Sequence, residues 1–249
     1  MKPDYPDQRH IPGLQRLWQE AFGDSDDFIR SFFSTAFDPG RCLCITENDT
    51  VLAAAYWFSC SYQGHPAAYI YAVATARAHR GKGLCRQLMH KIHQLLQQEQ
   101  CDCAILVPGD ASLARMYGAM GYRFFGGMET LRCDAGADPI ALCEIGPEEF
   151  ARLRQAYLMP GGVVQEGENL DFLRQHFRFY RGEGFVLTAA VEDGKLYSPE
   201  LLGEADPSAV LAALGAQSGT FRMPGRTPFA MFLPLRPADA PTYFGFAFD

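Results

Sequence analysis

The chain has 249 residues, of which 48% are hydrophobic, and its 22 basic and 29 acidic residues give a formal net charge of −7. This length accommodates one large domain or two small ones, and the composition is that of an ordinary soluble globular protein. The negative charge balance disfavours nucleic acid and anionic membrane as main partners and weakly favours a cationic or amine substrate.

The first residues, MKPDYPDQRH, are polar and include two prolines, which argues against a secretory signal. No apolar run approaches the roughly 20 residues that cross a membrane. Among the eight cysteines, the pairs Cys42/Cys44 and Cys101/Cys103 alternate along expected strands. We therefore expect reduced thiols in a cytoplasmic protein.

Two helices and a hairpin are expected first. Apolar residues at helical spacing predict a helix over Ile11–Phe22, and the acidic stretch from Asp24 to Asp27 caps a second helix. The apolar face of this second helix consists of Phe28, Ile29, Phe32 and Phe33. The hairpin comprises Cys42–Glu47 and Val51–Tyr62, with a turn at Asn48-Asp49.

The chain then changes character at a basic turn. Ala67–Thr75 is almost continuously apolar, as in a strand buried on both faces. From about Lys82 onward the apolar residues fall at spacings of three and four, which predicts an amphipathic helix. Between the strand and the helix lies Arg80-Gly81-Lys82-Gly83.

This turn has the features of an anion site. The first N–H groups of a helix lack partners within the helix, and the helix dipole adds positive charge there. Gly81 and Gly83 let ligand oxygens approach the backbone, and Arg80, Lys82 and Arg86 add formal charge. We predict a phosphate or pyrophosphate site, against the alternative of an ordinary glycine-containing helix start.

Two common phosphate-binding loops do not fit. The nucleoside triphosphate loop GxxxxGK[ST] is absent. The dinucleotide fingerprint GxGxxG would have Arg86 as its last residue, and no acidic residue stands where a ribose would need one.

The turn instead resembles the acyl-coenzyme A loop of the GCN5-related N-acetyltransferases, R/Q-x-x-G-x-G/A. Arg80-Gly81-Lys82-Gly83-Leu84-Cys85 follows this pattern up to Cys85, where the family prefers Gly or Ala. A second family motif, Tyr-x-x-x-Gly-Phe/Tyr, matches Tyr117-Gly118-Ala119-Met120-Gly121-Tyr122. The expected elements around it are a strand at Cys103–Val107, a helix at Ser112–Met120 and a strand near Phe124–Arg132. The resemblance covers roughly Ile11–Cys133.

The resemblance implies the acyl-CoA N-acyltransferase fold, an α/β (α+β) domain with a mixed, mostly antiparallel sheet flanked by helices. It also implies acetyl-CoA as cosubstrate, with backbone contacts from the central strand and a pyrophosphate on the amides of the turn. The implied coenzyme residues are Val73, Thr75, Arg80, Gly81, Lys82, Gly83, Leu84, Cys85 and Arg86. Tyr117 takes the family's general-acid position; the alternative is a core tyrosine whose hydroxyl has another partner.

The general base is less evident. Many family members place a Glu on the central strand, but Ala67–Ala76 contains no Asp, Glu or His. In the Eis-like members the C-terminal carboxylate reaches the active site, and this chain ends in an aromatic run, Tyr243–Asp249. Asp249 is therefore the candidate base by resemblance, with His65 and water as fallbacks. A final strand that only completes a sheet explains the run equally well.

The second half repeats the order of the first. The turn-forming stretch 134–139 predicts a boundary between domains 1–135 and 140–249. The elements expected beyond it are helices from Pro147 to about Tyr157, over Leu170–Tyr180 and between Asp206 and Gly215, a hairpin of Phe185–Val191 and Leu196–Leu202, and strands at Thr220–Met223, Phe229–Leu235 and Tyr243–Phe248. We interpret this half as a second, degenerate acetyltransferase-like domain. Its equivalent junction, Gly203-Glu204-Ala205-Asp206-Pro207, is acidic and would repel a pyrophosphate.

Three functions stay open at this point. The leading one is transfer of an acetyl group from acetyl-CoA to a primary amine of a small molecule, with no nucleic-acid or membrane partner and with homo-oligomerisation undecided. The alternatives are a protein or peptide N-acetyltransferase and a non-catalytic acyl-CoA-binding regulatory module. No metal is expected, because surface histidines and core thiols explain His90, His93, Cys101 and Cys103 better than zinc does.

Overall fold

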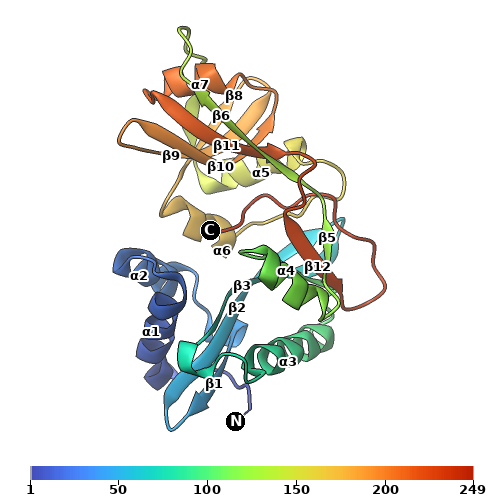
Figure 1. Ribbon diagram of the computed structural model, residues 1–249. Helices are drawn as coiled ribbons and strands as arrows, with labels where there is room; N and C mark the ends of the chain where they lie inside the picture. Colours follow the sequence, from blue (N-terminus) through green and yellow to red (C-terminus); the bar gives the residue numbers. More distant parts are fainter. Residues whose placement is uncertain (1, 249) are drawn as a thin grey trace. The chain divides into compact units, whose positions relative to one another are not determined.

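The structure, a computed structural model, describes residues 2–248 and divides into two compact units (Figure 1). Unit 1 contains the chain up to Arg123 together with Met231–Ala240, and unit 2 contains Phe124–Ala230 together with the chain from Pro241 onward. Each unit is built on one six-stranded sheet.

The first two helices of unit 1 form where their caps predict them. α1 spans Ile11–Phe22 and ends at Gly23, whose φ of 75° suits glycine at a helix C-terminus. α2 spans Asp26–Thr35, and the Phe28 amide donates to the Ser25 hydroxyl at 3.2 Å.

The sheet of unit 1 has the order β1-β2-β3-β4-β12-β5. Its strands are β1 Cys42–Glu47, β2 Thr50–Tyr62, β3 His65–Thr75, β4 Cys103–Leu106, β12 Ala230–Pro234 and β5 Arg123–Phe125. β3 and β4 are parallel and are connected through α3, Leu84–Gln98, whereas the pairs β1–β2, β2–β3 and β4–β12 are antiparallel. α4, Ala111–Gly118, connects β4 to β5, and short 3-10 turns occupy Gln8–His10, Pro39–Arg41 and Arg77–His79.

Side chains of β3 alternate between two apolar layers. Ala68 and Ile70 belong to the core cluster that α3 covers. Tyr71 points to the opposite layer, where its ring lies 5.5 Å from the Trp18 indole of α1, and Tyr69 stands 5.8 Å from Tyr71 on the same face. The period of two thus gives this unit a separate core on each face of its sheet.

Unit 2 has a similar arrangement of strands. Its elements are β6 Met128–Asp134, β7 Cys143–Ile145, α5 Pro147–Tyr157, α6 Glu168–Arg174, β8 Arg178–Gly182, β9 Phe185–Glu192, β10 Lys195–Gly203, α7 Pro207–Ala213 and β11 Ser218–Pro224. The sheet order is β6-β11-β10-β9-β8-β7, in which β10 and β11 are parallel, with α7 between them along the chain, and the other pairs are antiparallel. Both sheets therefore carry a run of antiparallel strands, then one parallel step across a helix, then an antiparallel partner, and in the first sheet β5 lies beyond that partner.

The strand predicted near Phe124–Arg132 is divided between the two sheets. Its first part belongs to β5 in the first sheet and its second part is β6 in the second sheet, with Gly126-Gly127 between them. A Cβ atom at Gly126 would stand 2.5 Å from the Thr242 carbonyl oxygen, so only glycine permits this close approach.

The division of the chain consequently differs from the predicted one. It falls at Arg123/Phe124 instead of 134–139, and β12 returns from the second half to complete the first sheet. The polar stretch at 134–139 only follows the end of β6. Pairing between distant strands is not visible in local composition, which explains the difference.

Two further predictions in the second half are wrong. The helix expected over Leu170–Tyr180 ends at Arg174, and β8 follows it, with Phe179 paired to Thr188 and stacked on Phe150 at 4.6 Å. The final run Tyr243–Phe248 makes a single β-bridge, between Tyr243 and Gly162, and no strand. Burial of its aromatic side chains holds it in place instead.

A buried ion pair anchors that final run within unit 2. Arg154 of α5 donates to Glu200 of β10 in two hydrogen bonds of 2.6 and 2.9 Å, and both side chains are almost fully buried. The Tyr243 hydroxyl donates to Glu200 Oε1 at 3.0 Å, and the Phe246 ring centroid lies 4.4 Å from the guanidinium. Burial opposes the charge of Arg154, but the adjacent Glu200 outweighs it and raises the pKa of the guanidinium.

Glu200→Gln is expected to lower the free energy of unfolding by about 3–5 kcal/mol, because it leaves the Arg154 charge buried without a counterion. Urea unfolding followed by circular dichroism measures this. The matched control is Glu149→Gln in the exposed pair with Arg181, which has an N–O distance of 3.3 Å and is expected to cost less than about 1 kcal/mol. Equal losses in the two variants would contradict the anchoring role.

No helix within residues 2–248 is long and apolar enough to span a membrane. All eight cysteines are free thiols. The described part of the chain contains no group of three or more His, Cys, Asp or Glu side chains that could hold a metal ion.

Candidate functional site

The predicted basic turn lies between β3 and α3. After the 3-10 turn Arg77–His79 the chain reaches the helix through Gly81 and Gly83, whose φ angles are 76° and 80°. A Cβ atom at either glycine would have no described neighbour within 4 Å. The glycines therefore adopt the left-handed backbone conformation that the turn requires, and they leave the surface of the turn open.

The N-terminus of α3 presents unused amide donors. The Gln87 amide makes the first helical hydrogen bond, to the Gly83 carbonyl at 3.1 Å, so the helix itself does not use the amides of Leu84, Cys85 and Arg86. No side chain in residues 2–248 caps this end. Ser, Thr, Asp or Asn usually caps a helix start, and an anion would satisfy these donors instead.

The side chains of the turn divide between solvent and core. Arg80 Nε donates to the Thr75 carbonyl at 3.1 Å, which ties the turn to the end of β3. Lys82 and Arg86 are exposed, and Leu84 is buried. Cys85 is half-buried against the α3 core, where burial raises the pKa of its thiol to about 11.

β3 leaves its partner β4 just before the turn. The parallel pairing covers only Ala67–Tyr69, whereas β3 continues to Thr75. The register with β2 shifts between Tyr71 and Ala74, and Ala72 has a φ of 46°. This is a β-bulge, which bends a strand and ends regular pairing. Val73 and Thr75 lie at or beyond the bulge, along an edge that β4 does not pair with in this stretch.

Tyr117 lies in the last turn of α4 and is 6% exposed. Its hydroxyl makes no hydrogen bond with the described residues, so the alternative of a satisfied core tyrosine receives no support. Burial, and to a lesser degree the nearby Cys85 thiol, raise the pKa of Tyr117. The phenol is therefore protonated at neutral pH and has a proton to donate.

A second tyrosine supports the first. The Tyr122 ring packs edge-on against Tyr117 at 5.7 Å, and the Tyr122 hydroxyl lies 2.8 Å from His93 Nε2 of α3. Burial, and to a lesser degree the neighbouring His90, lower the pKa of His93 to about 4. The sequence analysis interpreted His93 as a surface histidine in preference to a zinc ligand, but its ring is half-buried, and no pattern in the sequence pairs it with Tyr122.

His93 is expected to make the protein less stable as the pH falls below about 6.5. Its folded pKa lies below the unfolded value, so the unfolded chain binds the proton first, and lowering the pH from 7 to 5 costs on the order of 2 kcal/mol. Urea unfolding at both pH values measures this loss. The variant His93→Gln keeps a partner for Tyr122 and should show a smaller loss; an unchanged pH dependence would contradict the assignment.

The structure does not supply a base beside the bulge from β3 itself. His65 stands at the other end of β3, about 26 Å along the strand from Val73, and its Nδ1 pairs with Asp102 at 2.8 Å. The fallback to His65 is therefore wrong. Asp249 lies outside the described residues, so its role remains a prediction.

The corresponding junction of unit 2 is the N-terminus of α7, and a side chain of the junction itself caps it. Asp206 caps α7, accepting from the Ser208 amide at 2.9 Å and from the Ser208 hydroxyl at 2.8 Å. α3 thus has an open N-terminus with cations around it, whereas α7 has a capped one with a carboxylate.

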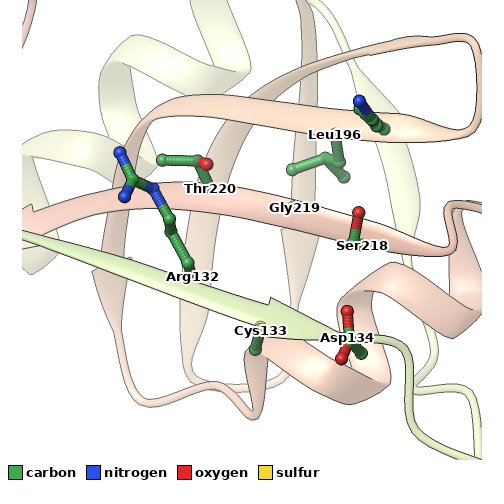
Figure 2. Close-up of a pocket in the computed structure, with 8 residues that line it drawn as sticks. Arg132, Cys133, Asp134, Leu196, Ser218, Gly219 and Thr220 are labelled. Atoms are coloured by element: carbon green, nitrogen blue, oxygen red, sulfur yellow. The ribbon is translucent and has the colours of Figure 1, made fainter.

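A shallow pocket of about 390 Å³ lies elsewhere on unit 2, at the beginnings of β10 and β11 and the end of β6 (Figure 2). Its lining consists of Arg132, Cys133, Asp134, Lys195, Leu196, Ser218, Gly219 and Thr220. None of the predicted site residues belongs to it.

Comparisons with known proteins agree with this geometry. A family model described as "Acetyltransferase (GNAT) domain" matches residues 4–125. A GCN5-related N-acetyltransferase from Kribbella flavida aligns over 93% of this chain and 70% of its own, with 19% identity and a TM-score of 0.69. Eis1 from Mycobacterium abscessus aligns over 92% and 66%, with 14% identity and a TM-score of 0.65.

A tandem GNAT protein from the clavulanic acid biosynthesis pathway aligns over 96% of this chain and 99% of its own, with 12% identity and a TM-score of 0.59. At these identities the structural likeness shows the fold alone. A search of curated proteins finds no match to the sequence.

The fold, with its open helix terminus beside a bulged strand, is that of an acyl-CoA N-acyltransferase. Residues 4–125 form an acetyltransferase (GNAT) domain, as the two motifs predicted, so the protein is an N-acetyltransferase.

Proposed function

We propose that this protein transfers the acetyl group of acetyl-CoA to a primary amine of a small molecule. The observation that carries the proposal is the uncapped N-terminus of α3 at the end of a strand that has left its neighbour. The amides of Leu84, Cys85 and Arg86 would hold the pyrophosphate, with Lys82 and Arg86 adding charge. The edge of β3 near Val73 and Thr75 would hydrogen-bond the amide-containing arm of the coenzyme, as an added strand does.

The reaction needs one nucleophile and one proton donor. The amine nitrogen attacks the thioester carbonyl carbon, the C–S bond breaks, and the thiolate leaves with the electron pair. Tyr117 donates its proton to that sulfur and recovers one from solvent, while the amine gives its own proton to a base. For the base, the carboxylate of Asp249 remains our candidate, by resemblance to the Eis-like acetyltransferases.

A single coenzyme site in each chain follows from the same reasoning. The Asp206 carboxylate already occupies the amide donors of α7 and would repel a phosphate. We therefore assign the coenzyme to unit 1 only.

Two measurements on the full chain test the proposal. Isothermal titration calorimetry with CoA is expected to show one site per chain. Thiol release from acetyl-CoA is expected to require an added amine. Absence of CoA binding would remove the coenzyme assignment, and binding without turnover of any amine would favour the regulatory module. Turnover restricted to peptides with a free amine would favour the peptide acetyltransferase.

A further inference from the structure

We propose that the pocket on unit 2 in Figure 2 binds a small polar molecule through an oxyanion group, either a phosphate ester or a carboxylate. We call it the β11 pocket, because β11 runs through its centre, between β6 and β10. None of its lining residues belongs to the proposed coenzyme site, so this proposal goes beyond the proposed function and does not depend on it.

Side-chain alternation separates the polar lining of the β11 pocket from the core of unit 2. Leu196 is buried in the core cluster to which α7 contributes, and Cys133 packs against that cluster. Because successive side chains of a strand point to opposite faces, Lys195 and Arg132 point away from this core, and so does Thr220, which pairs with Arg132. Figure 2 shows the Arg132 side chain extending from β6 across β11 beside Thr220. The polar lining therefore lies on the face of the sheet opposite α7.

The cations of the β11 pocket have no counterion within the described chain. The side chains of Arg132 and Lys195 are exposed and make no hydrogen bond or ion pair within residues 2–248, and the Asp134 carboxylate of the same pocket pairs with neither. The half-buried hydroxyls of Ser218 and Thr220 also have no hydrogen-bond partner in that range. Guanidinium, ammonium and hydroxyl groups all donate to oxyanions, and Arg binds phosphate or carboxylate with two parallel hydrogen bonds. The pocket thus offers the donors that an oxyanion needs.

The equivalent place in unit 1 is apolar. Thr220 is the third residue of β11 in its parallel pairing with β10, and it pairs with Arg132 of the next strand. Ile105 is the third residue of β4 in its parallel pairing with β3, and it pairs with Phe232. Ile105 and Phe232 are both buried. The same alignment places Cys103 and Ala67 of unit 1 at the positions of Ser218 and Lys195. A sheet of this kind can therefore close the position with apolar side chains, and the polar lining of unit 2 is not a requirement of the fold.

The lining also selects the class of ligand. The volume of about 390 Å³ lies within the range of small-molecule pockets. Arg132 and Lys195 against Asp134 leave one net positive charge, which suits a molecule with a single anionic group. Among the described lining residues none is aromatic, so the pocket favours a hydroxylated body over an aromatic one.

The test compares three probes with the same carbon skeleton by isothermal titration calorimetry on the full chain. Glycerol 3-phosphate carries a phosphate ester, glycerate carries a carboxylate, and glycerol carries neither. We expect at least one of the two anions to bind with a Kd of about 1 mM or lower, since charge-assisted hydrogen bonds are the strong ones, and glycerol not to bind. Binding of only one anion identifies the oxyanion group as phosphate or carboxylate.

Variants locate the binding site. Arg132→Gln and Lys195→Gln should each raise the Kd about 10- to 100-fold, the contribution of a hydrogen bond to a charged group. Asp134→Asn should lower the Kd, because it removes a negative charge beside the anion. The matched control is Arg152→Gln, which removes an exposed cation of α5 that does not line the pocket and should leave the Kd unchanged.

One further variant separates the β11 pocket from the coenzyme site. Gly83→Asp alters the start of α3 in unit 1 and should leave the Kd for the anionic probe unchanged. The proposal is overturned if neither anion binds, if glycerol binds equally well, or if Arg132→Gln weakens binding no more than Arg152→Gln does. Weaker binding in Gly83→Asp would place the probe at α3 and would also overturn it. None of these results bears on the proposed function, which CoA binding and amine-dependent thiol release test separately.

Discussion

Replacing Gly83 with aspartate is expected to abolish most of the affinity for CoA. The new carboxylate would stand at the uncapped start of α3, where the amides of Leu84 and Cys85 have no partner within the helix and could bind an anion. Repulsion of a pyrophosphate at about 4 Å in a partly exposed site amounts to several kcal/mol, so we expect the Kd for CoA to rise at least about 100-fold. Isothermal titration calorimetry measures this directly.

Gly64→Asp provides the control for Gly83→Asp. Gly64 has the same φ of 80° and no described neighbour within 4 Å of a Cβ atom, but it lies in the turn between β2 and β3. The backbone strain should therefore cost the two variants a similar 1 kcal/mol or so of stability. If Gly64→Asp weakened CoA binding as much as Gly83→Asp does, the coenzyme would not bind at α3.

Tyr117→Phe is expected to lower kcat about 100-fold, the range of general acid catalysis. The phenyl ring keeps the packing against Tyr122, so CoA affinity should change less than about twofold. Because the Tyr117 hydroxyl makes no hydrogen bond with the described residues, its loss should also leave the free energy of unfolding nearly unchanged.

Tyr62→Phe is the matched control for Tyr117→Phe. The Tyr62 hydroxyl donates to the Asp239 carbonyl at 2.9 Å in the same unit. Its removal should therefore lower the free energy of unfolding by about 1 kcal/mol and leave turnover unchanged. Unaltered turnover in Tyr117→Phe would remove this residue from the mechanism and leave protonation of the thiolate to water.

Most local structure of unit 1 could be predicted because each element has its own determinants. The apolar spacing of α1, the Ser25 cap of α2 and the turn residues of the β1–β2 hairpin act over a few residues, and these elements form within one residue or so of the predicted bounds. In unit 2 such determinants misled twice, over Leu170–Tyr180 and over the final run Tyr243–Phe248. The apolar spacing of Leu170–Tyr180 suits a helix, but Phe179 is buried by pairing with β9 and packing on α5.

The candidate site divides in the same way. The glycine turn and the Tyr117 motif can be recognised in the sequence, because the close approach of a ligand to the backbone requires glycine and proton donation requires a hydroxyl group. The bulge at Ala72 and the support of Tyr117 by His93 and Tyr122 could not be read from it. These features arise from contacts between residues 15 to 30 positions apart, such as Tyr71 with Tyr56 and His93 with Tyr122.

The sequence by itself determined that this chain contains an acetyltransferase domain, because the anion-binding turn and the tyrosine motif are local and depend on residue identity. Only the tertiary structure decided which strands share a sheet. β12 pairs with β4 although more than a hundred residues separate the two strands along the chain, and two glycines separate β5 in one sheet from β6 in the other. Such long-range pairing follows from the burial of whole sheet faces. The same packing places the Tyr71 ring against the Trp18 indole, one residue before the bulge at Ala72.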